Sequence, residues 1–455
     1  MANTYLKRTN GTPTNSGKGT FSFWVKKCFN SNGGRLIMNY YGPNDYAYIR
    51  LHPDNYLQMY EVNNGSMRSH YKTNRLFRDT NAWYHFQFVI DTSESTATDR
   101  FKIYVNGELE TSYNTQTFGA SSGFNLLSAS GSNHHTIGSA EDGSNSFDGL
   151  MSHVHFCDGT ALAPTVFGST DSTTGEWKIN TNPSFTPGNN GYTILKDGNT
   201  ITDQSTNSND FTLGAGTLTK TEDNPSNNFA TFNPVHIYET NTDHTWENGN
   251  TRYYSNNNNW GNTFSSLGFT SGKFYAEAKI INLAASNGYG AVGVVDINKS
   301  TYSGNDATIN QNTNTAGVVL DYRSGQSALR SGASTVTSNI GNFSNGDILG
   351  LAVDMDNKAL YVHLNGTYYQ INSVTGVPTS GSSKTGAITI PATCETACFN
   401  LGSYASVSEV AFNFGNGYFE TTAVSSAGTN ASGNGIFEYD VPTGYTALST
   451  KGLNL

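Results

Sequence analysis

Residues 345–366 read NGDILGLAVDMDNKALYVHLNG, and this stretch decides the fold. Its centre, DMDNK, begins like a calcium loop, with Asp354 and Asp356 at the first and third ligand positions. The rest of that motif is missing, because Lys358 takes the fifth position and the required glycine and glutamate are replaced by alanine and asparagine. Apolar residues at every second position flank the centre on both sides. The stretch therefore predicts a β-hairpin that turns at Asp-Asn.

The same order of features occurs in the first third of the chain. Residues 86–107, FQFVIDTSESTATDRFKIYVNG, and residues 349–366 both run from a strand to an aspartate, a polar turn, a strand with Tyr-Val and then Asn-Gly. The openings also correspond, with SGKGTFSFWV at 16–25 and SGKFYAEAKI at 271–280. Each region closes on an alternating strand, MSHVHF or VSEVAFNF. A pattern repeated in this order predicts two sandwiches of related architecture.

Composition narrows the class of protein. Of the 455 residues only 13% are charged, while 48 are glycine, 26 tyrosine and 25 phenylalanine. Alternating apolar runs separated by Asn, Gly and Ser predict an all-β protein of short strands. The net charge of -10 argues against a nucleic-acid-binding surface. No apolar run is long enough for a spanning helix, so we expect no membrane insertion.

The fold class is therefore all-β, with two jelly-roll β-sandwiches joined by a packed, loop-rich connector. We assign residues 1–165 to the first sandwich, 166–240 to the connector and 241–455 to the second sandwich with a C-terminal tail. The connector is rich in Pro, Asn and Ser, but aromatic residues are spread through it. Because a flexible linker of that length would be unusual, we expect the connector to pack against its neighbours through short strands.

Aromatic and amide side chains gather in two stretches, YYGPNDYAY at 40–48 and NTRYYSNNNNWGN at 250–262. On the loops of a rigid scaffold, such residues could stack on sugar rings and hydrogen-bond to hydroxyl groups. The alternative is that the same aromatics are core or interface anchors. The candidate glycan-binding residues are Tyr40, Tyr41, Tyr46, Tyr253, Tyr254, Asn257 and Trp260.

The motifs that could support catalysis are incomplete. Glu108 and Glu110 in GELE share a strand face, whereas a glycosidase needs two carboxylates that face each other across the substrate. The sequence GASSG at 119–123 matches a nucleophile elbow, yet no helical period follows it. We interpret the first motif as a solvated edge and the second as a loop, and we predict no enzymatic activity and no catalytic residue.

The histidines and cysteines do not form a metal-binding motif. His153 and His155 share a strand face and could join the pair at 134–135, but no acid or cysteine stands at a suitable spacing. Cys394 and Cys398 leave three interpretations open: a local disulfide, part of a metal site, or two thiols in a loop. We predict no metal site and no cofactor.

Several segments resemble known domains. The segments FSFWVKK, WYHFQFVID, FKIYVNGELE and FDGLMSHVHFCDGTAL make residues 16–165 similar to laminin-G-like domains, which are concanavalin-like jelly rolls. The segments SGKFYAEAKI, GAVGVVD, NGDILGLAVDMDNKALYVHLNG and VAFNFG make residues 241–420 resemble SPRY-type domains, which are also concanavalin-like. This order, together with ALAPTVFGSTDSTTGEW, DQSTNSNDFT, DNPSNNFATFNP and the C-terminal VPTGYTALSTKGLNL, resembles structural proteins of marine bacteriophages.

The resemblance implies a non-enzymatic bacteriophage virion surface protein, with lectin-like domains that bind host surface glycans. The first jelly-roll pattern begins close to Met1, without heptads or a collagen-like repeat. This favours a capsid decoration, a knob-like protein or a short tail appendage. Two alternatives stay open: a tail-fibre receptor-binding adhesin and a polysaccharide depolymerase.

The resemblance also implies the partners and the location. The expected partners are other capsid or tail proteins, host surface glycans and further copies of the chain in a homo-oligomer, with no nucleic acid. The N-terminal stretch lacks the apolar core of a secretory signal. We therefore expect the protein in the virion, after synthesis in the host bacterial cytoplasm.

Overall fold

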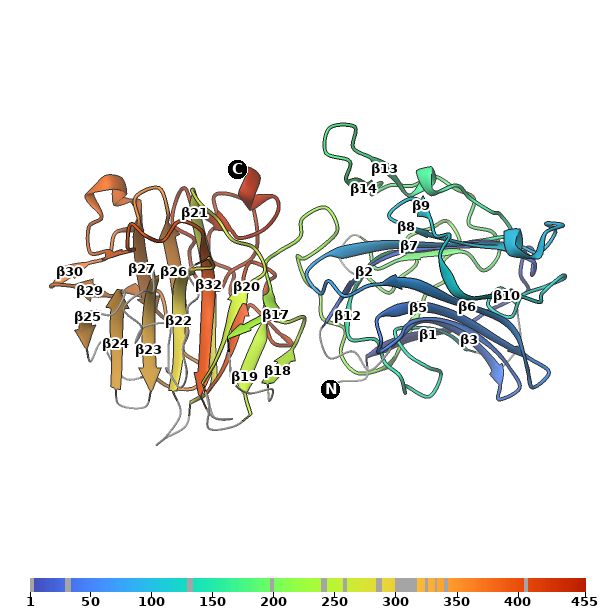
Figure 1. The fold of residues 1–455 in the computed structure, drawn as a ribbon, viewed down its shortest axis with the longest axis horizontal. Coiled ribbons are helices and arrows are strands. Elements are labelled where there is room, and N and C mark those ends of the chain that lie inside the picture. Colours follow the sequence, from blue (N-terminus) through green and yellow to red (C-terminus); the bar gives the residue numbers. More distant parts are fainter. Residues whose placement is uncertain are drawn as a thin grey trace. The chain divides into compact units, whose positions relative to one another are not determined.

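The computed structural model divides into two compact units, Met1–Lys220 and Thr221–Leu455. Both units consist of packed β-sheets, so the predicted all-β class is confirmed (Figure 1). The structure describes residues 4–28, 34–128, 134–196, 200–238, 244–256, 260–283, 289–298, 317–323, 326–331, 334–338, 343–404 and 408–455. Within these ranges, no helix has the length and apolar character needed to cross a membrane.

The first unit is a sandwich of two sheets, seen as two layers in Figure 1. The larger sheet has eight strands in the order β10-β6-β5-β4-β3-β11-β1-β16, and the smaller has six in the order β15-β12-β2-β7-β8-β9. Alternate apolar side chains meet between them, such as Phe21 and Phe23 from the smaller sheet and Ile49 and Met59 from the larger, all fully buried.

The bounds of the elements in this unit follow in chain order. They are β1 (Tyr5–Thr9), β2 (Lys18–Lys27), β3 (Arg35–Gly42), β4 (Asp45–Leu51), β5 (Tyr56–Asn63), β6 (Ser66–Leu76), β7 (Trp83–Asp91), η1 (Ala97–Arg100), β8 (Phe101–Val105), β9 (Glu108–Leu109), β10 (Tyr113–Phe118), β11 (His134–Ile137), β12 (Gly149–Asp158), η2 (Pro164–Val166), β13 (Gly168–Thr170), β14 (Trp177–Ile179), β15 (Tyr192–Ile194) and β16 (Thr212–Ala215).

The second unit is also a sandwich. Its described strands form a seven-stranded sheet in the order β17-β20-β32-β22-β23-β24-β25 and a nine-stranded sheet with the path β18-β19-β33-β21-β26-β27-β28, to which β31 and β36 add. The bounds are β17 (Phe232–Tyr238), β18 (His244–Glu247), β19 (Arg252–Ser255), β20 (Trp260–Ser265), β21 (Lys273–Leu283), β22 (Tyr289–Asp296), β23 (Gly317–Arg323), β24 (Gln326–Ser331), β25 (Ser334–Ser338), β26 (Ile348–Asp354), β27 (Ala359–Leu364), β28 (Thr367–Tyr368), β29 (Gln370–Ile371), β30 (Val374–Thr375), η3 (Pro378–Ser383), β31 (Ile388–Thr389), β32 (Ala397–Tyr404), β33 (Ser408–Asn413), β34 (Tyr418–Phe419), β35 (Thr422–Ala423), β36 (Thr446–Ala447) and η4 (Gly452–Asn454).

The stretch DMDNK is the turn of a hairpin, as predicted. Strands β26 and β27 pair in antiparallel register from Leu349 opposite Leu364 to Asp354 opposite Ala359. The Asp354 carboxylate accepts hydrogen bonds from the backbone and side-chain amides of Asn357, at 2.9 and 2.8 Å. These oxygens therefore close the turn.

The two units share an ion pair at the same place in the repeated pattern. Lys18 of β2 lies opposite Asp91 of β7, and their side chains are 2.7 Å apart. Lys273 of β21 lies opposite Asp354 of β26, with a separation of 3.1 Å. Each lysine comes from the SGK opening of its region and each aspartate ends the first strand of its hairpin. The correspondence seen in the sequence is thus also a correspondence in register.

The predicted connector is divided between the two units. Up to Lys220 it belongs to the first unit, where β15 pairs with β12 and β16 pairs with β1. Asp203 fastens this part, because its carboxylate accepts hydrogen bonds from the backbone amides of Thr193 (2.8 Å), Ser205 (2.9 Å) and Asn209 (2.8 Å). The chain divides at residue 220, within the segment expected to join the sandwiches.

Candidate functional site

The outer face of the larger sheet in the first unit has a row of tyrosines. The register sets Tyr40 of β3 opposite Tyr46 of β4. It also sets Tyr48 of β4 opposite Tyr60 of β5. Successive ring centroids along this row are 6.5, 6.2 and 5.7 Å apart, and neighbouring ring planes differ by 27°, 7° and 27°. We call these four residues the tyrosine ladder.

The tyrosine ladder is partly open to solvent. Tyr40, Tyr46 and Tyr60 are half-buried, whereas Tyr48 in the middle is 8% exposed and packs with Met38. Burial raises the pKa of both Tyr46 and Tyr48, so their phenol groups stay protonated near neutral pH. The ladder therefore offers apolar ring surface together with neutral hydroxyl groups, which is the combination that aromatic sugar-binding surfaces use.

A row of basic side chains lies beside the ladder. Arg35 of β3 lies opposite Arg50 of β4, and the row continues to Lys72 of β6. The guanidinium carbons of Arg35 and Arg50 are 4.7 and 5.5 Å from the centroid of the Tyr48 ring. The Lys72 ammonium is 4.1 Å from the centroid of the Tyr56 ring. We call the three cations the basic row, and each is held by contact with an aromatic face.

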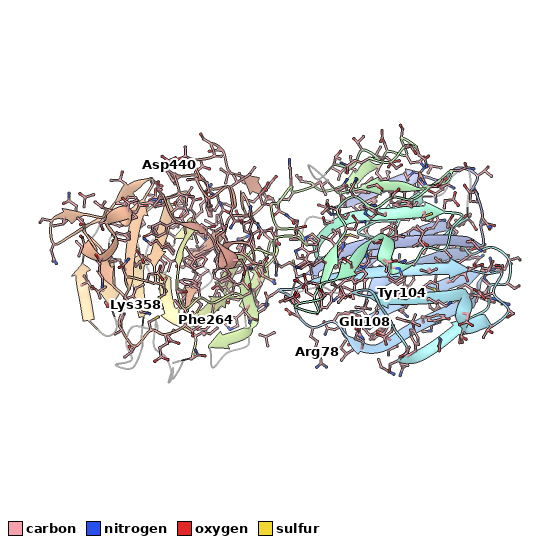
Figure 2. The ribbon with its side chains drawn as sticks, turned by 90° about the horizontal axis from the view of Figure 1, so that it is seen from above. Arg78, Tyr104, Glu108, Phe264, Lys358 and Asp440 are labelled. Atoms are coloured by element: carbon pink, nitrogen blue, oxygen red, sulfur yellow. The ribbon has the colours of Figure 1, made fainter. Side chains whose placement is uncertain are left out.

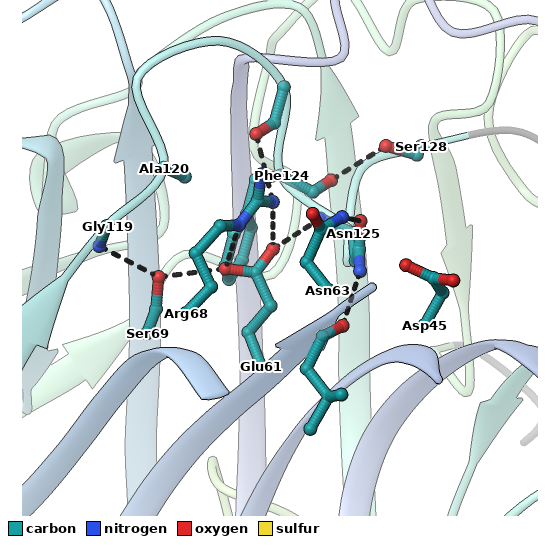
Figure 3. Close-up of polar contacts among 12 residues, drawn as sticks. Asp45, Glu61, Asn63, Arg68, Ser69, Gly119, Ala120, Phe124, Asn125 and Ser128 are labelled. Atoms are coloured by element: carbon teal, nitrogen blue, oxygen red, sulfur yellow. Dashed lines mark hydrogen bonds and ion pairs between the residues drawn. The ribbon is translucent and has the colours of Figure 1, made fainter. Parts of the chain in front are cut away.

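A buried polar network fixes the opposite side of β5 (Figure 3). The Glu61 carboxylate is fully buried and accepts hydrogen bonds from Arg68 Nε (2.9 Å), Ser69 Oγ (2.8 Å) and the Asn125 backbone amide (3.0 Å). Asn125 Nδ2 donates to the Val62 carbonyl at 2.7 Å. Because Glu61 follows Tyr60 in the chain, this network stiffens the backbone from which the ladder projects.

Two of the three predicted residues in the first unit belong to the ladder and one does not. Tyr40 and Tyr46 stand together on the outer face. Tyr41 is the next residue along β3, so alternation turns it to the other face, and burial raises its pKa to about 12. Tyr41 is therefore no part of the candidate site.

The predicted residues of the second unit do not form a comparable surface in the part that the structure describes. Tyr253 is fully buried among core residues, and its hydroxyl is 2.9 Å from His244 Nδ1, so its assignment to glycan binding is corrected to a core position. Tyr254 is half-buried under the Arg252 guanidinium, 5.2 Å from its ring centroid. Asn257 lies outside the described residues, as does the side chain of Trp260, whose backbone begins β20.

The sequence analysis missed Tyr48 and Tyr60. Tyr48 lies in the alternating stretch AYIRLH, where it shares a face of β4 with Tyr46. Tyr60 lies in the alternating stretch YLQMYEV, where it shares a face of β5 with Gln58. The periodicity of each stretch could have indicated the face of each tyrosine. It does not give the register between β4 and β5, which brings the two tyrosine faces together.

The acid pair and the Gly-x-Ser-x-Gly motif are not assembled for catalysis. Glu108 is exposed on β9, whereas Glu110 is buried and forms an ion pair with Arg75 at 3.0 Å. The GASSG stretch is a loop in which the Gly119 amide donates to the Arg68 carbonyl at 3.0 Å. The two carboxylates therefore point into different environments, and no helix follows the serines within residues 119–128.

His135 and His155 lie on different sheets of the first sandwich. His135 is buried with Nε2 2.8 Å from the Tyr192 hydroxyl, while His155 is buried with Nδ1 2.9 Å from the Thr193 hydroxyl. In the described portion of the chain, no three His, Cys, Asp or Glu side chains are placed to hold a metal ion. Cys398 is fully buried, and burial raises the pKa of its thiol well above the usual value.

A second polar cluster is buried in the second unit. Glu277 Oε1 is 3.1 Å from the Tyr275 hydroxyl, which is 2.7 Å from His363 Nε2. The Glu277 carboxylate also accepts hydrogen bonds from the backbone amides of Glu438 (2.9 Å) and Tyr439 (2.8 Å). Burial raises the pKa of Glu277 to about 7 and lowers that of His363 to about 4. All three side chains are buried, so the cluster fastens the C-terminal segment to β21 and has no open face for a substrate.

Part of the chain matches a known protein family, and parts of it resemble solved structures at low sequence identity. Three solved structures illustrate the likeness: the SPRY domain of human HERC1 (17% identity, TM-score 0.30, covering 40% of this chain and 96% of that one), a heptameric SAP-like pentraxin from Limulus polyphemus (16%, 0.28, 43% and 89%) and a putative carbohydrate binding protein from Bacteroides ovatus (19%, 0.30, 48% and 58%). No curated protein matches the chain. Residues 1–167 match the family model described as the Concanavalin A-like lectin/glucanases superfamily, of the type Laminin_G_3.

Proposed function

We propose that the protein is a non-enzymatic glycan-binding protein and that the tyrosine ladder is its binding surface. The observation that supports this most is the gathering of four tyrosines from three strands on one solvent-facing side of the sandwich. A lone exposed aromatic needs no explanation, but a contiguous set on a monomer surface is typical of an interaction site. The family match of residues 1–167 to lectins and glucanases supports a carbohydrate as the ligand.

Binding is favoured over hydrolysis by the placement of the acids. A glycosidase positions two carboxylates on either side of the scissile bond. Of the acids suggested by the sequence, Glu108 is exposed, whereas Glu110 is buried in an ion pair with Arg75. The Glu61 carboxylate beneath the ladder already accepts hydrogen bonds from Arg68 and Ser69. A depolymerase remains the alternative of the enzyme class, and release of reducing sugars from a bound polysaccharide by the purified protein would establish it.

We further propose that this binding protein is a bacteriophage virion component that attaches to host surface glycans. The support is the order of sequence segments that resembles phage structural proteins. In this proposal the partners are other capsid or tail proteins and further copies of the chain. Many copies over the capsid, seen by labelling intact particles, would indicate a decoration protein, and a few at the tail tip would indicate an adhesin. Absence from purified particles would contradict the virion role.

The binding proposal is tested by removing ladder rings. Tyr46→Ala and Tyr60→Ala should each weaken retention on an immobilised bacterial surface polysaccharide by roughly tenfold, as expected for loss of a stacking contact of about 1–1.5 kcal/mol. Tyr104→Ala is the matched control, because Tyr104 is a half-buried tyrosine on β8 of the other sheet (Figure 2). Equal retention of all three variants and the parent protein would contradict the proposal.

A further inference from the structure

We infer that the ligand of the tyrosine ladder is an acidic polysaccharide, and that Arg35 and Arg50 bind its carboxylate or sulfate groups. This inference rests on the proposed glycan binding at the ladder. It adds the chemical class of the sugar and two residues that the sequence analysis did not select. The basic row, Arg35, Arg50 and Lys72, supplies the argument.

The two arginines have an unfavourable cross-strand position. Arg35 and Arg50 are directly opposite each other on β3 and β4. Like charges in that position repel and destabilise a sheet. The repulsion acts on Arg35, whose pKa is lowered mainly by burial and further by the charge of Arg50. A pair that costs stability in the free protein is explained when an anion lies between the two guanidinium groups.

Neither arginine forms an ion pair with an acid among the described residues. Arg35 Nη1 is 3.1 Å from the Met38 sulfur, and Arg50 Nε donates to Gln58 Oε1 at 2.6 Å. Among the residues that the structure describes, no carboxylate lies within ion-pair distance of either guanidinium. Arg35 Nε is buried and has no hydrogen-bond partner in that part of the chain. Buried donors are normally satisfied, so the Arg35 guanidinium is incompletely hydrogen-bonded in the free chain.

Asp142 does not fill that role. Asp142 influences Arg35 electrostatically, but its carboxylate Oδ1 accepts hydrogen bonds from the Ser144 amide (2.9 Å) and hydroxyl (2.6 Å). The Asp142 side chain therefore closes its own turn. The planar guanidinium forks of Arg35 and Arg50 stay available for a planar carboxylate or a tetrahedral sulfate.

The basic row stands out in an acidic protein. The chain has 25 lysines and arginines against 35 acids, for a net charge of -10. Three cations on β3, β4 and β6, each against a tyrosine ring on the same sheet, are thus a local reversal of the overall charge. An acidic sugar could stack its ring on the tyrosine ladder while its acidic group binds the arginines of the basic row. The match of residues 1–167 to lectins and glucanases favours a polysaccharide over a nucleic acid as the polyanion.

The experiment measures binding of the full chain to four immobilised probes: a polyuronate such as alginate, dextran sulfate, unmodified dextran and single-stranded DNA. We expect the polyuronate or the dextran sulfate to bind, with affinity falling as salt is raised. Arg35→Gln and Arg50→Gln should each weaken that binding by roughly tenfold or more, as expected for a hydrogen bond between charged groups. Arg78→Gln is the control, because Arg78 is an exposed arginine of the same unit (Figure 2) and should change nothing.

Thermal stability separates a ligand-binding role from a structural one. Removing one arginine of the opposed pair relieves repulsion, so the melting temperature of Arg35→Gln and Arg50→Gln should stay the same or rise. Weaker binding with an unchanged or higher melting temperature supports the inference. Should Arg35→Gln fail to fold, Arg50→Gln is the deciding variant, because its guanidinium has no buried donor without a partner.

The remaining outcomes discriminate between the two proposals. If only neutral dextran binds, and Tyr60→Ala weakens it while the arginine variants do not, the acidic-ligand inference is overturned and glycan binding stands. If the parent protein binds none of the three polysaccharides, both the acidic-ligand inference and the glycan-binding proposal are overturned. Binding of DNA as tight as that of the acidic polysaccharides, with the same dependence on Arg35 and Arg50, overturns the assignment of the ligand class.

Discussion

In both sandwiches, a later segment of the chain packs on the outer face of one sheet and covers it. The side chains of the sheet that bind this covering segment differ between the two units. In the first unit, Trp177 Nε1 donates to His85 Nδ1 at 3.1 Å, and Phe167 packs against His155 on the outer side of the smaller sheet. In the second unit, the backbone of residues 438–439 donates to Glu277 on the outer side of the nine-stranded sheet. The first cover is held by neutral imidazoles and the second by a carboxylate.

This difference teaches how two units of related fold can differ in their sensitivity to acid. A buried imidazole resists protonation, because its positive form would lose water and gain no partner. Burial lowers the pKa of His85 and His135 to about 3 and that of His155 well below its usual value. A buried carboxyl resists ionisation instead, and for Glu277 the pKa rises to about 7. Acidification therefore charges buried histidines in the first unit, whereas in the second unit it neutralises Glu277 as well as charging His363.

The largest expected effect is on the pH dependence of the two stabilities. For His85 and His135 the folded pKa is below the unfolded value of 6.5, so the unfolded chain binds more protons and stability falls as pH falls from 7 to 5. Each histidine should cost about 2 kcal/mol at pH 5, or about 4 kcal/mol together. Hydrogen exchange of the full chain at both pH values, followed on peptides of each unit, measures this change.

The second unit should respond much less to the same acidification. Protonation of His363 should destabilise the second unit by about 2 kcal/mol between pH 7 and pH 5, because its folded pKa of about 4 is below the unfolded value of 6.5. Glu277 offsets this by about the same amount, because its folded pKa of about 7 exceeds the unfolded 4.5 and the folded state binds more protons between them. The variant His85→Gln is the control and should remove about 2 kcal/mol of the pH effect in the first unit. An equal loss in both units would break the comparison.

The next effect is the loss of the carboxylate anchor itself. Glu277→Ala leaves the amides of Glu438 and Tyr439 without their acceptor, so we expect a loss of about 3 kcal/mol in the free energy of unfolding of the second unit. Denaturant titration with exchange detection should show the first unit unchanged. The control is Glu108→Ala, since Glu108 is exposed on β9 of the first unit (Figure 2) and its loss should cost less than about 0.5 kcal/mol. A small effect of Glu277→Ala would show that the cover is held by its apolar contacts alone.

What could be predicted from the sequence was the part encoded over short distances. The DMDNK hairpin needs only alternation and a turn, which lie within residues 345–366. Tyr40 and Tyr46 flank one tight turn, so they were found together. The correspondence of the two regions was visible because it repeats in order along the chain.

What could not be predicted depends on pairing between distant strands. Tyr60 joins the ladder, and Arg50 meets Arg35, only through strand register, which alternation alone leaves open. Tyr253 was misassigned because a tyrosine on a strand has the same pattern whether its face is open or covered by other residues. The role of Glu277 likewise depends on a segment more than 150 residues later in the chain.

The smallest effect concerns the feature that the two units share, the Lys–Asp pair that links the opening strand to the hairpin. Asp354 is fully buried, so Lys273→Met would leave its charge without the Lys273 partner, and we expect a loss of about 2 kcal/mol in the second unit. Lys18 is 33% exposed and its partner Asp91 15%, so Lys18→Met should cost only about 0.5 kcal/mol in the first unit. Raising salt should shrink the Lys18 effect and leave the Lys273 effect largely unchanged, because only the exposed pair is screened. Equal losses in the two units would mean that the burial of the ion pair does not determine how much it contributes to stability.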